Sequence, residues 1–260
     1  QEESVTTPEA TIILDQRLSA YPHGVFGHGA HSPGGHPGNG EGDGHDLLTC
    51  DAFEWAVTAA MSIGAHLAER NYSLRFLDSA GAPAFRDSPS APDPDAEAYT
   101  GTAGLQSIAE SLAAIELSGP HHTHHHTRPH HDHRQGPRPD EMTSGANGPQ
   151  AFDDTLMDKL SAHRLRGPVL AVLGKLSPAE ARALSPAAGF GANAFALLVT
   201  DHGQDSGDLP EVLEALRLGG WRAVAVSARS SLPDAWAAFD QPDPAMSAAA
   251  DVRRGVGGRP

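Results

Sequence analysis

Short apolar runs alternate along this chain with longer segments in which apolar residues recur every three or four positions. The runs are rich in β-branched and other apolar residues, and such continuous runs are typical of strands that are buried on both faces of a parallel sheet. We expect strands at residues 10–14, 72–77, 169–173, 194–199 and 222–226, and a short additional strand at 84–85.

The segments between these runs carry helical periodicity. The first predicted helix follows Thr49 or Asp51 as its N-cap and ends before Asn71. Ser177-Pro178-Ala179-Glu180 has the sequence of a capping box, with proline at the first helical position. We expect helices at residues 53–67, 104–117, 152–164, 177–184, 209–218 and 233–239. Alternating strands and helices predict right-handed crossovers, and therefore a doubly wound, mostly parallel α/β sheet of the Rossmann-like class.

Three stretches interrupt this pattern and are dominated by Gly, Pro, His, Asp and Ser. Such segments bury too little apolar surface to offset the entropy of ordering, so we expect loops or long disordered insertions. The prediction is one α/β domain over residues 1–240, with low-complexity insertions at 21–46, 80–99 and 118–150. Residues 241–260 are predicted to be a disordered tail.

Charge and cysteine content exclude several classes of protein. The formal net charge of −15 repels the phosphates of nucleic acids and anionic membrane surfaces, so we expect no nucleic-acid partner. Cys50 is the single cysteine, which excludes an intrachain disulfide and a cysteine-based zinc site. No apolar run approaches the ~20 residues that cross a bilayer. We therefore expect contact with the membrane only through a region upstream of Gln1. The preference for Arg over Lys, with abundant Ala, Gly and Pro, indicates a GC-rich, actinobacterium-like source.

Several segments, in this order, resemble one bacterial family, the domain of unknown function 58 family in its actinobacterial form. The segments are residues 14–17 (LDQR), 53–57 (FEWAV), 66–70 (HLAER), 167–174 (GPVLAVLG), 219–226 (GGWRAVAV) and 232–236 (LPDAW). Members of that family carry a von Willebrand factor A-like domain, usually downstream of membrane helices, and are often encoded beside MoxR-type AAA ATPases. The resemblance implies the carboxyl-terminal portion of such a protein: a non-enzymatic interaction or assembly module at the cytoplasmic face of the cell membrane, with a MoxR-type AAA ATPase as partner.

The resemblance also implies a cation site at the carboxyl edge of the sheet. Von Willebrand factor A domains hold a divalent cation, typically Mg²⁺, with an Asp-x-Ser-x-Ser loop, a Thr and an Asp. Asp15 and Ser19 match the first and last residues of the loop, and Thr102 resembles the Thr. Arg17 replaces the middle serine, which removes an oxygen ligand and adds positive charge. We therefore expect a degenerate cation site of Asp15, Ser19 and Thr102, or an Asp15 carboxylate that satisfies helix N-terminal amides and pairs with Arg17 at the strand end.

Two histidine-rich tracts are the other candidate metal ligands. The first holds His23, His28, His31, His36 and His45, and the second holds His121, His122, His124, His125, His126, His130, His131 and His133. Imidazole clusters bind Zn²⁺, Ni²⁺ or Cu²⁺. Irregular spacing among Gly and Pro favours opportunistic binding. The alternative function is therefore a histidine-rich transition-metal-binding protein, and titration of these imidazoles at about pH 6.5 makes a pH-sensitive element a further hypothesis.

Catalytic motifs give little support to an enzyme. The sequence has no Gly-x-Ser-x-Gly elbow after a strand, no phosphate-binding loop and no dinucleotide-binding turn. We therefore expect no catalytic residues and no certain cofactor. The competing hypothesis is an enzyme that uses Asp15 and Asp201 at the sheet edge.

Overall fold

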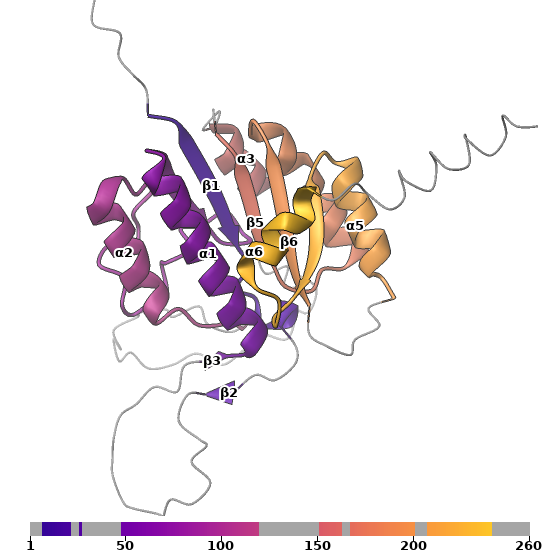
Figure 1. The fold of residues 1–260 in the computed structure, drawn as a ribbon, viewed down its shortest axis with the longest axis horizontal. Coiled ribbons are helices and arrows are strands. Elements are labelled where there is room, and N and C mark those ends of the chain that lie inside the picture. Colours follow the sequence, from indigo (N-terminus) through magenta and orange to yellow (C-terminus); the bar gives the residue numbers. More distant parts are fainter. Residues whose placement is uncertain are drawn as a thin grey trace, which may run out of the picture.

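A five-stranded parallel sheet forms the centre of the protein in the computed structural model, which describes residues 7–21, 26–27, 48–119, 151–162, 167–200 and 207–240 (Figure 1). The strand order is β4-β1-β5-β6-β7. The strands are β1 (Glu9–Leu14), β4 (Ser73–Leu77), β5 (Val169–Leu173), β6 (Ala194–Thr200) and β7 (Arg222–Ser227). Every neighbouring pair is parallel, which confirms the predicted α/β class. A separate antiparallel pair joins β2 (Phe26–Gly27) to β3 (Leu48–Thr49).

The strands form where the sequence is continuously apolar because helices cover both faces of the sheet. In β5, all five residues are buried. Leu170 and Val172 face the first core layer, whereas Val169, Ala171 and Leu173 face the second. The alternation of side chains along a strand thus splits one apolar run between two cores.

Helices divide between the two faces (Figure 1). The first core layer contains α1 (Asp51–Glu69), α2 (Gly101–Ala113) and the short α6 (Leu232–Ala237), with α2 packed on α1. The second contains α3 (Asp154–Ala162), α4 (Pro178–Leu184) and α5 (Leu209–Leu218). Short 3₁₀ turns are η1 (Leu18–Ala20), η2 (Ser185–Phe190) and η3 (Ala238–Asp240).

Helix capping agrees with the sequence at one helix and differs at another. The predicted capping box of α4 is confirmed, since Glu180 N donates to Ser177 Oγ at 3.2 Å and Ser177 N donates to Glu180 Oε2 at 2.7 Å. The N-cap of α1 is Cys50, so the predictions of Thr49 and Asp51 were wrong. Thr49 Oγ1 instead donates to the Glu54 carboxylate at 2.6 Å.

The structure of residues 80–99 differs from the predicted strand and disordered insertion. They contain no helix or strand, so the short strand at 84–85 is absent, but they are not the disordered insertion expected from their composition. Phe85 and Tyr99 are buried and pack with Phe76, with ring centroids 5.0 Å and 6.3 Å from that of Phe76. The segment is therefore anchored to the edge strand by two aromatic rings, which an average over polar composition conceals.

The other predicted insertions and the tail fall mainly on residues 28–47, 120–150 and 241–260, which lie outside the described residues. Within the described ranges, Tyr21 is buried beside Phe53, with ring centroids 5.4 Å apart. A search of the helices in the same ranges found none with the length and apolar character needed to cross a membrane.

Candidate functional site

The topological switch point of the sheet lies between β1 and β5. From β1 the chain moves to β4 on one side, and from β5 it moves to β6 on the other side. Open α/β sheets bind ligands beyond the carboxyl ends of the strands at such a topological switch point. Asp15 directly follows β1, and its backbone N donates to Val172 O at 3.0 Å. The structure therefore places Asp15 at the rim where the sequence predicted it.

Arg17 occupies both oxygens of the Asp15 carboxylate. Arg17 Nε lies 2.8 Å from Oδ1 and Nη2 lies 2.9 Å from Oδ2, and the Arg17 backbone N also donates to Oδ1 at 3.2 Å. The Asp15 residue is 0% exposed. The remaining Nη1 of Arg17 donates to Glu180 at the start of α4, and the guanidinium lies 5.0 Å from the centroid of the Phe152 ring. The predicted pairing of Asp15 with Arg17 is confirmed, and every hydrogen bond to the Asp15 carboxylate among the described residues comes from Arg17.

Opposite charges at the switch point stabilise the ionised forms of Arg17 and Glu180. Burial alone lowers the pKa of Arg17, but the hydrogen bond and charge of Asp15, together with Glu180, raise that pKa above its ordinary value. Burial raises the pKa of Glu180, but the hydrogen bonds from Ser177 and the charge of Arg17 lower it on balance. Tyr21 lies nearby with its pKa well above the ordinary value, because burial and the Asp15 charge both oppose its ionisation. One guanidinium is thus shared by two carboxylates where a ligand would bind.

The predicted cation site is not assembled. Thr102 lies on the exposed first turn of α2, and the preceding Tyr99 is hydrogen-bonded to Leu74, which is the register partner of Ala10. Ala10 is five residues before Asp15, or about 16 Å along a strand. Thr102 therefore lies toward the amino ends of the strands and Asp15 lies at the carboxyl ends.

Ser19 does not complete a site either, because it is exposed in η1 while Arg17 holds Asp15. The prediction of Asp15, Ser19 and Thr102 as joint ligands was wrong because it matched residue types without the distance between the two ends of the sheet. Among the residues that the structure describes, no group of three or more His, Cys, Asp or Glu side chains could hold a metal ion.

The remaining candidate residues from the sequence lie outside the described part of the chain. Asp201 and the histidines of both tracts fall outside the described ranges. These residues are His23, His28, His31, His36, His45, His121, His122, His124, His125, His126, His130, His131 and His133.

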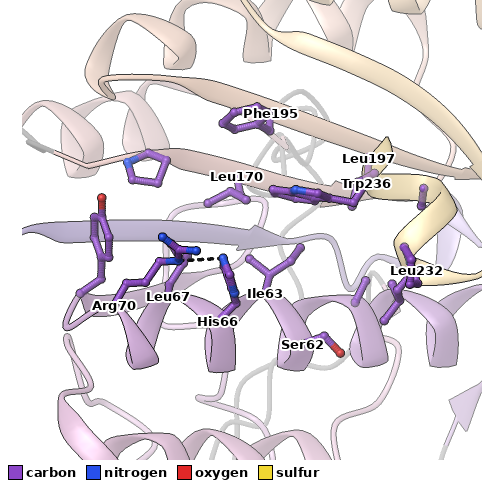
Figure 2. A pocket seen from close by; sticks show the side chains of 15 residues that line it. Ser62, Ile63, His66, Leu67, Arg70, Leu170, Phe195, Leu197, Leu232 and Trp236 are labelled. Carbon is purple, nitrogen blue, oxygen red and sulfur yellow. Dashed lines mark hydrogen bonds between the residues drawn. The ribbon is translucent and has the colours of Figure 1, made fainter. Parts of the chain in front are cut away.

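An apolar groove that the sequence analysis did not anticipate lies between α1 and α6, above β5 and β6 (Figure 2). Its volume is about 610 Å³. Leu170 and Leu197 form the floor, Leu67 lies on the α1 side, and Leu232 and Trp236 lie on the α6 side. The whole lining is Ala59, Ser62, Ile63, His66, Leu67, Arg70, Tyr72, Pro168, Leu170, Phe195, Leu197, Leu232, Pro233, Ala235 and Trp236.

The groove is open because the two helices that flank it differ in length. The nineteen residues of α1 span about 28 Å, whereas the six of α6 span about 9 Å, so α6 covers only part of the sheet face beside α1. Trp55 Nε1 donates to Ser230 O at 2.8 Å, which anchors α1 to the turn before α6. Trp236 packs on Phe195 at 5.8 Å between centroids but remains 43% exposed.

One end of the groove carries the positive charge of Arg70. His66 and Arg70 lie one helical turn apart on α1, and Arg70 Nε donates to His66 Nε2 at 2.9 Å (Figure 2). This bond requires an unprotonated Nε2 on His66. The described residues that line the groove include no Asp or Glu, although the chain carries a net charge of −15.

A sequence signal for the groove existed on α1. Residues 59, 62, 63, 66, 67 and 70 follow helical spacing and share one face, which continues beyond the face that packs on the sheet. Leu67 belongs to both faces, and Ile63 extends the apolar surface outward. The sequence indicates this second apolar face of α1, but it does not show that α6 lies across the groove from it.

Comparison with known proteins adds no assignment: no protein-family model, no curated protein and no solved structure matches this chain.

Proposed function

We propose that this chain is a non-enzymatic protein-interaction module that receives its partner in the groove between α1 and α6. The observation that carries the proposal is the groove itself, an apolar surface with a half-exposed tryptophan on its wall. Contiguous apolar surface of this kind marks interaction sites on otherwise polar proteins. Trp and Arg, which are both present here, are also enriched among residues that dominate binding energy.

In this proposal, binding does not depend on a divalent cation. A cation at the switch point would have to displace a bidentate guanidinium from Asp15 and then lie next to its positive charge. Mg²⁺ also requires several oxygen ligands in near-octahedral order, and Thr102 is too distant to be one of them. The switch point thus supports a structural role for Asp15.

The proposed partner is a MoxR-type AAA ATPase, and the proposed location is the cytoplasmic face of the cell membrane. Both come from the family resemblance, as does the assignment to the von Willebrand factor A-like fold. The parallel sheet with Asp15 at its switch point supports that fold assignment, and the apolar groove supports a protein partner.

A binding assay with the purified MoxR-type ATPase from the same genome tests the proposal. We expect the intact protein to bind the ATPase equally with Mg²⁺ and with EDTA, and Ile63→Glu to reduce binding at least tenfold, because it places a charge on the apolar wall. Leu218→Glu is the matched control, since Leu218 is 82% exposed on α5, in the helix layer on the opposite face of the sheet. Equal binding by the Ile63→Glu variant, or loss of binding in EDTA, would contradict the proposal.

A further inference from the structure

We infer that the groove receives an amphipathic α-helix of about three turns, whose apolar face packs beside α1 and whose acidic side chain meets Arg70 and His66. The inference rests on the proposed interaction function and specifies the chemistry of the partner. It follows from the length of the groove, the pairing of its floor strands and the charge at its end.

The α1 side of the groove fixes the length of the occupant. Its lining runs from Ala59 to Arg70, which is eleven residues along the helix, or about 16 Å. A second helix of about three turns matches this distance. Helices pack at interaxial distances of about 8–10 Å, so a helix beside α1 would lie above β5 and β6, in the space that the short α6 leaves open.

The floor of the groove favours a helix over an extended peptide. β5 pairs with β1 and β6, and β6 pairs with β5 and β7, so both floor strands have neighbours on each side. An extended peptide binds by adding a strand to an unpaired edge, which this floor does not offer. A helix satisfies its own backbone hydrogen bonds and needs only an apolar surface.

The charge of the lining favours an acidic residue in the partner. Arg70 supplies the positive charge, and its hydrogen bond to His66 holds the guanidinium through Nε, one of its five N–H donors. The nearest acidic residues along the flanking helices, Glu69 and Asp234, do not line the groove, and Asp234 accepts a hydrogen bond from Ser231 Oγ at 2.6 Å. The negative net charge of the whole chain would instead attract a basic helix. Whether the groove prefers an acidic or a basic helix therefore distinguishes the local charge from the net charge.

Three designed helical peptides test the inference on the full-length chain. All three share leucines at positions i, i+3, i+4, i+7 and i+11, and they differ only in carrying Glu, Gln or Lys in both terminal turns. The fluorescence of Trp236 reports binding, and a Trp236→Phe variant identifies its signal. We expect the Glu peptide to bind about two- to fivefold more tightly than the Gln peptide, as for an exposed ion pair, and the Lys peptide to bind most weakly.

Substitutions in the protein separate the contributions. Arg70→Gln should remove the preference for Glu over Gln and leave the Gln peptide's affinity unchanged, whereas Ile63→Glu should weaken all three peptides. Leu218→Glu should change none of them. A preference for the Lys peptide, or no binding of any peptide, overturns the inference. Saturable binding of decanoate in the absence of peptide binding also overturns it, because the groove would then hold a small apolar acid.

The two levels of proposal fail separately. If the ATPase binds in an Ile63-dependent manner but the peptides do not bind, the interaction function stands and the helical, acidic partner is wrong. If the Glu peptide binds and the ATPase does not, the groove is a helix-binding site and the assigned partner is wrong.

Discussion

The switch point and the α1–α6 groove are opposite kinds of surface in one small sheet. The switch point holds buried charges at the place where α/β proteins commonly bind ligands, yet Arg17 already pairs with both oxygens of Asp15 and also with Glu180. The groove has no recognisable motif, yet its apolar walls, which include Ile63 and Trp236, are open to solvent. Residues that match a motif at a common binding location are therefore weaker evidence of binding than apolar side chains left exposed to solvent.

The contrast has an energetic basis. A buried carboxylate requires a partner, and removing that partner leaves an uncompensated charge in the interior. The side chains at the rim of the groove, Ile63, His66 and Trp236, are half-buried or exposed, so changes there should affect binding more than folding. The expected effects below run from the largest to the smallest.

Replacing Arg17 should have the largest effect on stability. Arg17→Ala leaves the fully buried Asp15 carboxylate without its bidentate partner, and we expect the free energy of unfolding to fall by about 3–5 kcal/mol. Urea denaturation measures this change. The control is Arg182→Ala, which breaks the exposed pair with Glu211 and should cost less than about 1 kcal/mol. Equal losses in the two variants would show that the switch point is not held by this ion pair.

The two tryptophans Trp221 and Trp236 compare a closed site with an open one. Trp221 is 2% exposed and its Nε1 donates to Ser185 O at 3.2 Å, so Trp221→Ala should cost about 3–5 kcal/mol. Trp236 is 43% exposed, and Trp236→Ala should cost less than half as much. Chemical denaturation of both variants gives the two values. A larger loss for Trp236→Ala would mean that the groove wall is structural and not a binding surface.

Acid should weaken the switch point through Glu180. Because the folded pKa of Glu180 lies below its ordinary value of 4.5, its contribution is present above that pH and is lost as the pH falls through the folded pKa. The side chain is partly exposed, so we expect this contribution to be no more than about 1 kcal/mol. Glu180→Gln should therefore lose less stability than the unchanged protein between about pH 5 and pH 3. Parallel acid profiles of the two proteins would contradict this expectation.

Restoring a serine at position 17 should have no effect on Mg²⁺ binding. Arg17→Ser recreates the Asp-x-Ser-x-Ser pattern at residues 15–19, but Thr102 stays near the other end of the strands. We therefore expect no saturable Mg²⁺ binding by calorimetry, measured at a temperature where the variant is folded. Stoichiometric Mg²⁺ binding would show that the loop alone can form the site and would reverse the conclusion drawn from Thr102.

The elements of this fold could be predicted from the sequence because their signals are local. The apolar run at residues 169–173 matches β5 at both ends, and the Ser177-to-Glu180 capping box specifies the start of α4. The position of Asp15 also followed from the sequence, since parallel strands end at one edge of the sheet. The pairing of Asp15 with Arg17 was foreseeable because the two residues are only two positions apart at the end of β1.

Tertiary structure alone decided which distant residues meet. The aromatic anchors Phe85 and Tyr99 pack on Phe76 only after the chain turns back along β4, and Thr102 is separated from Asp15 by the direction of α2. The groove depends on α1 and α6, which are joined across 175 positions by the Trp55–Ser230 hydrogen bond. Local patterns set which residues are apolar, but the space left between packed helices depends on their relative placement, which no local pattern contains.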